Sequence, residues 1–102
     1  MPDTARMVER EVMVASDLGF HMRPMQRFIE ILGGFKADVT VRRRDAADGE
    51  PAPPVEVDGR SIFGLMELAA AKGTRLVLAG RGDDADAALD ALADFFARNF
   101  DE

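Results

Sequence analysis

The stretch Gly19-Phe20-His21-Met22-Arg23-Pro24 organises the sequence, because it carries the single histidine and leads directly into a helical pattern. Pro24 is tolerated in the first turn of a helix, where backbone N–H groups have no intrahelical partner to lose. Those unpaired N–H groups and the positive end of the helix dipole stabilise an anion. A neutral imidazole at this point has one ring nitrogen that can act as a nucleophile. The stretch is therefore the candidate functional centre, with His21 as a candidate phosphoryl acceptor.

Outward from this stretch, the spacing of apolar residues predicts alternating strands and helices. Strands are expected over 8–15, 37–42, 55–58 and 75–79. Helices are expected to follow Pro24 for about ten residues, to run from 62 towards 72, and to follow a cap at Asp83 and Asp84. The last helix has an apolar stripe made of Ala85, Ala88, Leu89, Leu92, Phe95 and Phe96. The order βαββαβα predicts an α+β, two-layer, open-faced sandwich. Its four-stranded, mainly antiparallel sheet would be covered on one face by three helices, in a single domain spanning 1–102.

Composition excludes several classes of function. The 102 residues include no cysteine and one histidine, so we expect no disulfide, no thiolate catalysis, no metal site and no cofactor. A net charge of −6 does not favour nucleic-acid binding, and the run Arg42-Arg43-Arg44 is typical of a solvated strand end. No apolar run approaches the roughly 20 residues that span a bilayer, and the stretch up to Glu11 is charged, unlike a signal peptide. A cytoplasmic protein without membrane insertion is expected.

Two further segments stand out. Residues 43–54 are rich in arginine, aspartate and proline, which predicts a mobile surface loop. Ile62, Phe63 and Met66 cluster at the start of the second helix, which raises the alternative that at least two of them are exposed for docking rather than buried in the core.

At this point a resemblance becomes specific. The segment Leu18–Pro24 resembles the active-site signature Leu-Gly-Leu-His-Ala-Arg-Pro of the histidine-containing phosphocarrier protein HPr family of the bacterial phosphotransferase system. The segment Gly59–Met66 resembles the regulatory-serine segment of the same family. Two matches in the family's order are much stronger than either alone.

The resemblance implies that His21 accepts a phosphoryl group on Nδ1 from phosphorylated Enzyme I, which draws it from phosphoenolpyruvate. His21 would pass the group to a histidine on an enzyme II A-type domain in sugar uptake, as a stoichiometric carrier rather than an enzyme. Arg23 has a forked cation able to bind phosphate oxygens, and the backbone amides of Met22 and Arg23 are candidate donors.

Regulation and docking are also implied by the resemblance. Serine is a favoured N-cap, so a structural role for Ser61 is expected, and the family adds phosphorylation by HPr kinase/phosphorylase. In the family this corner lies beside the active histidine and forms an apolar docking patch. The candidate docking residues are Phe20, Met22, Ile62, Phe63 and Met66.

The chain departs from the family pattern near the histidine. Ser16 and Asp17 stand where the family often has asparagine, and a carboxylate close to phosphohistidine would repel it. Phe20 and Met22 replace the smaller or aliphatic residues that usually flank the histidine. We expect these differences to affect partner choice or transfer rate rather than transfer itself.

Three alternatives stay open. The chain could serve a nitrogen-type regulatory phosphorelay instead of sugar uptake, which its residues do not distinguish. It could be an HPr-like interaction module that is never phosphorylated, although His21 and Arg23 together argue against this. A ligand-binding α+β domain would need a polar pocket that no residue cluster indicates.

Overall fold

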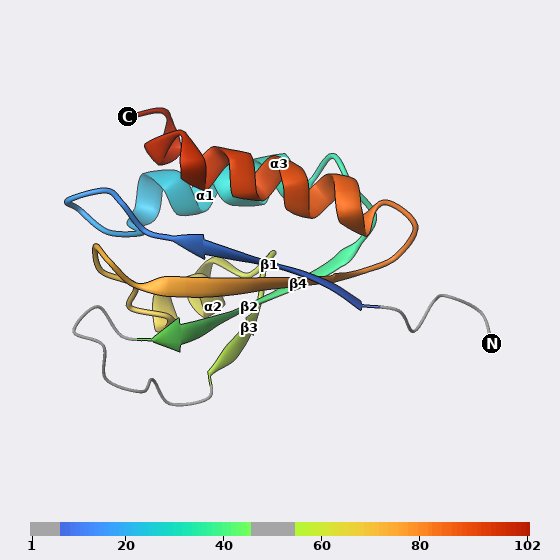
Figure 1. The fold of residues 1–102 in the computed structure, drawn as a ribbon, viewed down its shortest axis with the longest axis horizontal. Helices are drawn as coiled ribbons and strands as arrows, with labels where there is room; N and C mark the ends of the chain where they lie inside the picture. The colour runs from blue at the N-terminus through green and yellow to red at the C-terminus, as the bar shows by residue number, and fades with distance from the viewer. Residues whose placement is uncertain (1–6, 46–54) are drawn as a thin grey trace.

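The computed structural model describes residues 7–45 and 55–102 (Figure 1). Its elements are β1 (Met7–Met13), α1 (Met22–Leu32), β2 (Asp38–Asp45), β3 (Glu56–Asp58), α2 (Ile62–Glu67), β4 (Arg75–Arg81), α3 (Ala85–Ala97) and the 3-10 turn η2 (Asn99–Asp101). The order βαββαβα and the α+β class are confirmed. Within these described ranges, no helix is long and apolar enough to cross a membrane.

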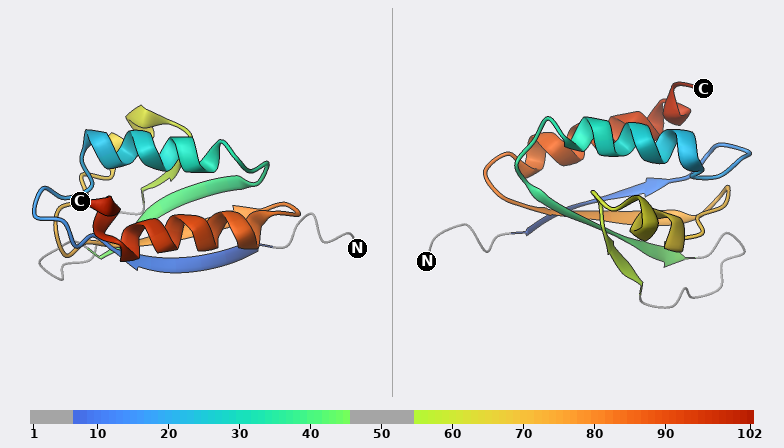
Figure 2. Two further views of the ribbon diagram at one scale, coloured as in Figure 1. Left: turned by 90° about the horizontal axis from the view of Figure 1, so that it is seen from above. Right: turned by 180° about the vertical axis from the view of Figure 1, so that it is seen from behind.

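The four strands form one antiparallel sheet in the order β1-β4-β2-β3. β4, the last strand in the chain, lies in the middle and pairs with both β1 and β2. Helices α1 and α3 lie side by side across one face of this sheet, and α2 lies against α1 and β3 (Figures 1 and 2). The other face is open, which matches the predicted sandwich.

The core lies between the sheet and the helices, where the predicted alternation holds. In β1 and the residue after it, Val12 and Val14 are buried while Met13 is exposed. Leu76 and Leu78 of β4 are fully buried. The predicted stripe of α3 is buried throughout, which is the amphipathic arrangement that its spacing indicated: Ala85, Ala88, Leu89, Leu92, Phe95 and Phe96.

Two strands are longer than predicted. β2 continues through Arg43 and Arg44, so the prediction that a loop begins at residue 43 is wrong, and Arg44 pairs with Glu11 across the open face at 3.2 Å. The rest of that predicted loop, residues 46–54, lies outside the described residues. β4 continues through Gly80, which pairs with both neighbouring strands. The prediction that this strand ends at residue 79 is therefore wrong.

Two helix ends also differ from the prediction. α2 ends at Glu67 rather than near Lys72, because the chain turns at Ala69 (φ +47°) and directs the carbonyl of Ala70 towards the loop before His21. Asp84 occupies the N-cap position of α3, but its side chain makes no capping bond. Instead, its carboxylate accepts the backbone N–H of Lys36 at 2.8 Å, so a tertiary contact replaces the local one.

Arg60 connects the end of α1 to the segment that leads into β2 by hydrogen bonds. This role was not predicted from the sequence. The Arg60 guanidinium donates to the backbone carbonyl of Leu32, the last residue of α1, at 3.2 Å, and to two carbonyls in the segment between α1 and β2, Phe35 at 3.0 Å and Ala37 at 2.9 Å. A cation at a helix C-terminus also complements the helix dipole. Arg60 therefore holds α1 in place at the end opposite to His21.

Candidate functional site

His21 is the N-cap residue of α1, with an extended backbone (φ −94°, ψ −175°) and a side chain that is 27% exposed. Its carbonyl accepts the first helical hydrogen bond, from the N–H of Met25 at 3.0 Å. Pro24 has no N–H, so the unpaired donors of the first turn are the amides of Met22 and Arg23. Neither amide donates to an acceptor in the part of the chain that the structure describes. These are the two amides named as candidate donors, and their binding of phosphate stays a prediction.

The loop before His21 is fixed by two close contacts with the segment after α2. The N–H of Phe20 donates to the carbonyl of Ala70 at 2.8 Å. Gly19 has φ +73°, and a Cβ at this position would lie 2.7 Å from the same carbonyl oxygen. Only glycine fits both requirements without strain, which explains its place in the motif.

Phe20 is not a docking residue. Its side chain is only 3% exposed and contacts three other rings, with centroid distances of 5.7 Å to Phe28, 5.2 Å to Phe96 and 5.5 Å to Phe100. The prediction that Phe20 offers a surface to partners is therefore wrong. Its larger ring instead anchors the residue directly before His21 in the aromatic core.

The imidazole of His21 contacts a carboxylate from the far end of the chain. His21 Nε2 lies 2.9 Å from Glu102 Oε2, and Glu102 Oε1 accepts a hydrogen bond from Ser16 Oγ at 2.7 Å. The Ser16 hydroxyl first, and then His21, lower the pKa of Glu102, and the nearby charge of Arg23 also contributes. Glu102 was not predicted as part of the site, because its contact with His21 spans 81 positions and no local pattern signals it.

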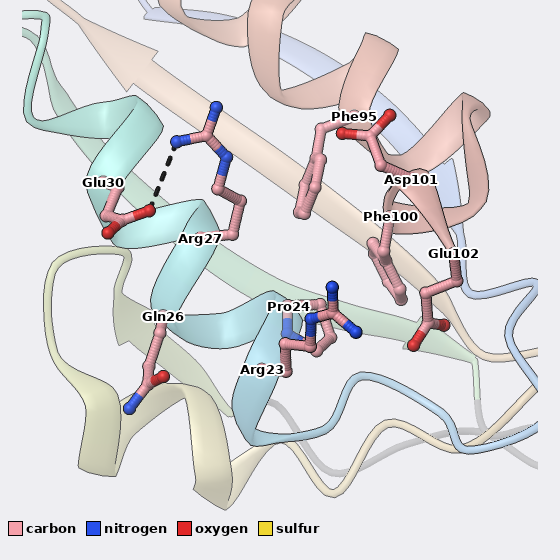
Figure 3. A pocket seen from close by; sticks show the side chains of 9 residues that line it. All are labelled: Arg23, Pro24, Gln26, Arg27, Glu30, Phe95, Phe100, Asp101 and Glu102. Carbon is pink, nitrogen blue, oxygen red and sulfur yellow. Dashed lines mark hydrogen bonds and ion pairs between the residues drawn. The ribbon is translucent and has the colours of Figure 1, made fainter.

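Arg23 is exposed beside this contact, on the first turn of α1. Figure 3 shows its guanidinium near Glu102, at one end of a groove between α1 and the segment after α3. Arg27, which also lines this groove, is paired with Glu30 at 3.2 Å. Arg23 forms no ion pair within residues 7–45 and 55–102, although its charge acts on the Glu102 carboxylate.

Asp17, whose carboxylate is expected to repel a phosphohistidine, forms an ion pair with Lys72. Its Oδ1 accepts a hydrogen bond from Lys72 Nζ at 2.6 Å, and Lys72 lowers the pKa of Asp17 through that bond and its charge. The ammonium therefore offsets the carboxylate's negative charge next to the loop.

Apolar side chains are exposed on α2 and at the start of α1. The exposed fraction is 76% for Phe63, 46% for Met66 and 44% for Met22, whereas Ile62 is half-buried against the core. At least two of the three α2 residues are thus exposed, as expected. α1 and α2 pack against each other, and the carbonyl of Ala70, just after α2, accepts the N–H of Phe20, so the segment that follows α2 lies close to the start of α1.

Ser61 is the N-cap residue of α2, as its residue type indicated. Its Oγ accepts the N–H of Gly64 at 3.0 Å, and its side chain is half-buried. Among the described residues, no group of three or more histidine or acidic side chains could hold a metal ion.

Comparisons with known proteins agree with this geometry. Residues 8–98 match the family described as "PTS HPr component phosphorylation site". The chain is 38% identical to phosphocarrier protein HPr of Pseudomonas putida over 96 residues, covering 94% of this chain and 98% of that one. It is 33% identical to phosphocarrier protein NPr of Shewanella violacea, covering 93% and 94%. A crystal structure of HPr from Bacillus anthracis superposes with a TM-score of 0.72 at 32% identity, covering 88% of this chain and 96% of that one.

Proposed function

The chain belongs to the HPr family of phosphocarrier proteins, and from that premise we propose that His21 accepts a phosphoryl group from phosphorylated Enzyme I. His21 then passes the group to an enzyme II A-type domain in sugar uptake. The observation that carries the proposal is an N-cap imidazole next to two backbone amides and a guanidinium, none of which has a hydrogen-bond or ion-pair partner among the described residues. The protein acts as a cytoplasmic carrier, which takes up and releases one phosphoryl group per cycle. It does not catalyse the conversion of a small molecule.

The site's residues divide the chemistry between them. A ring nitrogen of His21 attacks phosphorus, and the bond from phosphorus to the donor's histidine breaks with its electron pair returning to that donor. The negative oxygens of the transferred group are then bound by the amides of Met22 and Arg23 and by the Arg23 guanidinium. The same donors are compatible with onward transfer, because they hold the phosphoryl group by hydrogen bonds and charge and form no covalent bond to it.

Met22, Phe63 and Met66 form the proposed docking surface for Enzyme I and the enzyme II A-type domain. Their exposure next to a transfer site favours this role, since exposed apolar patches mark interaction sites. We propose Ser61 as the substrate of an HPr kinase/phosphorylase. Phosphorylation would change the Ser61 hydroxyl that caps α2 by accepting the N–H of Gly64, and it would place negative charge beside Phe63. That charge would weaken docking.

The test is incubation with phosphoenolpyruvate and Enzyme I, followed by intact mass and acid treatment, on the wild type and on His21→Ala. We expect one acid-labile phosphoryl group on the wild type and none on the variant. An unlabelled wild type would support the non-phosphorylated interaction module instead. Equal labelling of both proteins would move the acceptor away from His21. ATP and the kinase, with Ser61→Ala as the control, test the regulatory part.

A nitrogen-type relay is the second candidate, favoured by the similarity to NPr of Shewanella violacea. A carrier should accept the phosphoryl group faster from the donor of its own branch than from that of the other. The same mass assay, run in parallel with the Enzyme I of a sugar-uptake system and with that of a nitrogen-type relay, assigns the branch by the faster donor.

A further inference from the structure

The carboxylate of Glu102 is held against His21 from two sides. His21 Nε2 is 2.9 Å from one oxygen, and the hydroxyl of Ser16 donates to the other at 2.7 Å. The His21 and Glu102 side chains are 27% and 23% exposed, and Ser16 is buried. A carboxylate bound at both oxygens and partly shielded from water has a fixed direction relative to the ring.

The segment that carries Glu102 is anchored on the same core as His21. Phe100 is buried, with ring centroids 5.2 Å from Phe95, 4.9 Å from Phe96 and 5.5 Å from Phe20. Phe20 directly precedes His21. Both partners of the contact are therefore attached to one aromatic cluster, which keeps the carboxylate and the imidazole together.

An ionised carboxylate can only accept hydrogen bonds, so the ring nitrogen facing it must be the donor. The lowered pKa keeps Glu102 ionised at neutral pH. In a neutral imidazole, a proton on Nε2 leaves the lone pair on Nδ1. The second partner of a histidine commonly sets its tautomer in this way, as carboxylates do for histidines that bind metals.

We infer that Glu102 is a positioning residue, which holds the proton on Nε2 of His21 so that Nδ1 is the one nucleophilic nitrogen. This inference rests on the proposed phosphoryl transfer to His21 and names a residue that directs it. In the step, the Nδ1 lone pair forms the bond to phosphorus and the donor leaves with its electron pair. The Nε2 proton stays in place, and the positive charge that develops on the ring is paired with the Glu102 carboxylate.

The experiment uses phosphoramidate, a small phosphoryl donor that needs no partner protein, so docking cannot influence the outcome. The product is analysed by NMR, which distinguishes phosphohistidine substituted at Nδ1 from that substituted at Nε2. We expect the wild type to give the Nδ1 isomer alone. In Glu102→Ala we expect loss of this selectivity, with the Nε2 isomer appearing beside the Nδ1 isomer. Ser16→Ala, which removes one of the two anchors, is expected to show a smaller loss.

Glu67→Gln is the matched control, because it removes an exposed carboxylate at the end of α2 and changes the net charge equally. A second measurement, long-range proton–nitrogen correlation on unphosphorylated protein, should show a single Nε2–H tautomer in the wild type and a mixture in Glu102→Ala. The inference is overturned if wild type and Glu102→Ala give the same isomers, or if wild-type His21 carries its proton on Nδ1. Failure of the proposed function would look different: Enzyme I would not label the wild type, whereas phosphoramidate would still reveal the effect of Glu102.

Discussion

Phe20 and Phe63 offer a matched test of how the site is built, because the same substitution should lower stability at Phe20 and leave stability unchanged at Phe63. Phe20 is 3% exposed and contacts three rings, whereas Phe63 is 76% exposed. Truncating a core phenylalanine to alanine costs about 3–5 kcal/mol, which combines the lost transfer free energy with a cavity term. An exposed side chain away from special contacts changes stability by only about 0.5 kcal/mol or less.

We therefore expect Phe20→Ala to lower the free energy of unfolding by about 4 kcal/mol, as the middle of that range. At about 4–8 °C per kcal/mol for a domain of this size, the melting temperature would fall by at least about 16 °C. Phe63→Ala should unfold like the wild type while reducing the rate of labelling by Enzyme I. The assay is urea denaturation followed by circular dichroism, with calorimetry as a check. Equal stability losses at the two positions would refute the assignment of Phe20 to the core and of Phe63 to the surface.

Three more predictions concern the supports of the site. Gly19→Ala should lower the melting temperature and expose the N–H of Phe20 to hydrogen exchange, because its Cβ would displace the Ala70 carbonyl; unchanged exchange would argue against this contact. Arg60→Met should destabilise the protein by about 1–3 kcal/mol in urea denaturation, since it removes the charged donor of the Ala37 carbonyl and one of the two donors of the Leu32 carbonyl, which also accepts the N–H of Phe35; Arg27→Met, which removes an exposed ion pair with Glu30, serves as the comparison. Folding lowers the pKa of Glu102, so this residue contributes to stability at pH values above its ordinary pKa of 4.5, and the contribution is lost as the pH falls through the lowered pKa of the folded state. Glu102→Gln should therefore flatten this part of the plot of unfolding free energy against pH. A plot identical to that of the wild type would contradict the lowered pKa.

The predictable parts of this protein were those governed by local pattern. Alternation in β1 and the stripe of α3 define the buried faces without reference to other elements. The capping role of Ser61 also follows from residue type and position. The first turn of α1 was predictable as well, because Pro24 identifies which amides stay unpaired.

The features that were missed depend on contacts between distant segments. α2 ends early, and the carbonyl of Ala70 that follows it accepts the N–H of Phe20. The Asp84 carboxylate accepts the N–H of Lys36 instead of capping α3. The place of Phe20 in the motif predicts a docking residue, whereas its ring packs against Phe28 of α1, Phe96 of α3 and Phe100 of η2. No periodicity in one segment reports such pairings, since tertiary contacts override local preference.

The central place of β4 has a consequence for how the protein becomes active. β1 and β2 both pair with β4 and not with each other, so most of the sheet cannot close until the chain has been made as far as Arg81. The loop before His21 likewise depends on the segment just before β4, through Ala70. Pairings between distant segments are slow to form because the entropy of closing the chain is lost before the contacts compensate for it. A nascent chain therefore carries the complete histidine motif long before it has a working site, and maturation of the site coincides with completion of the fold.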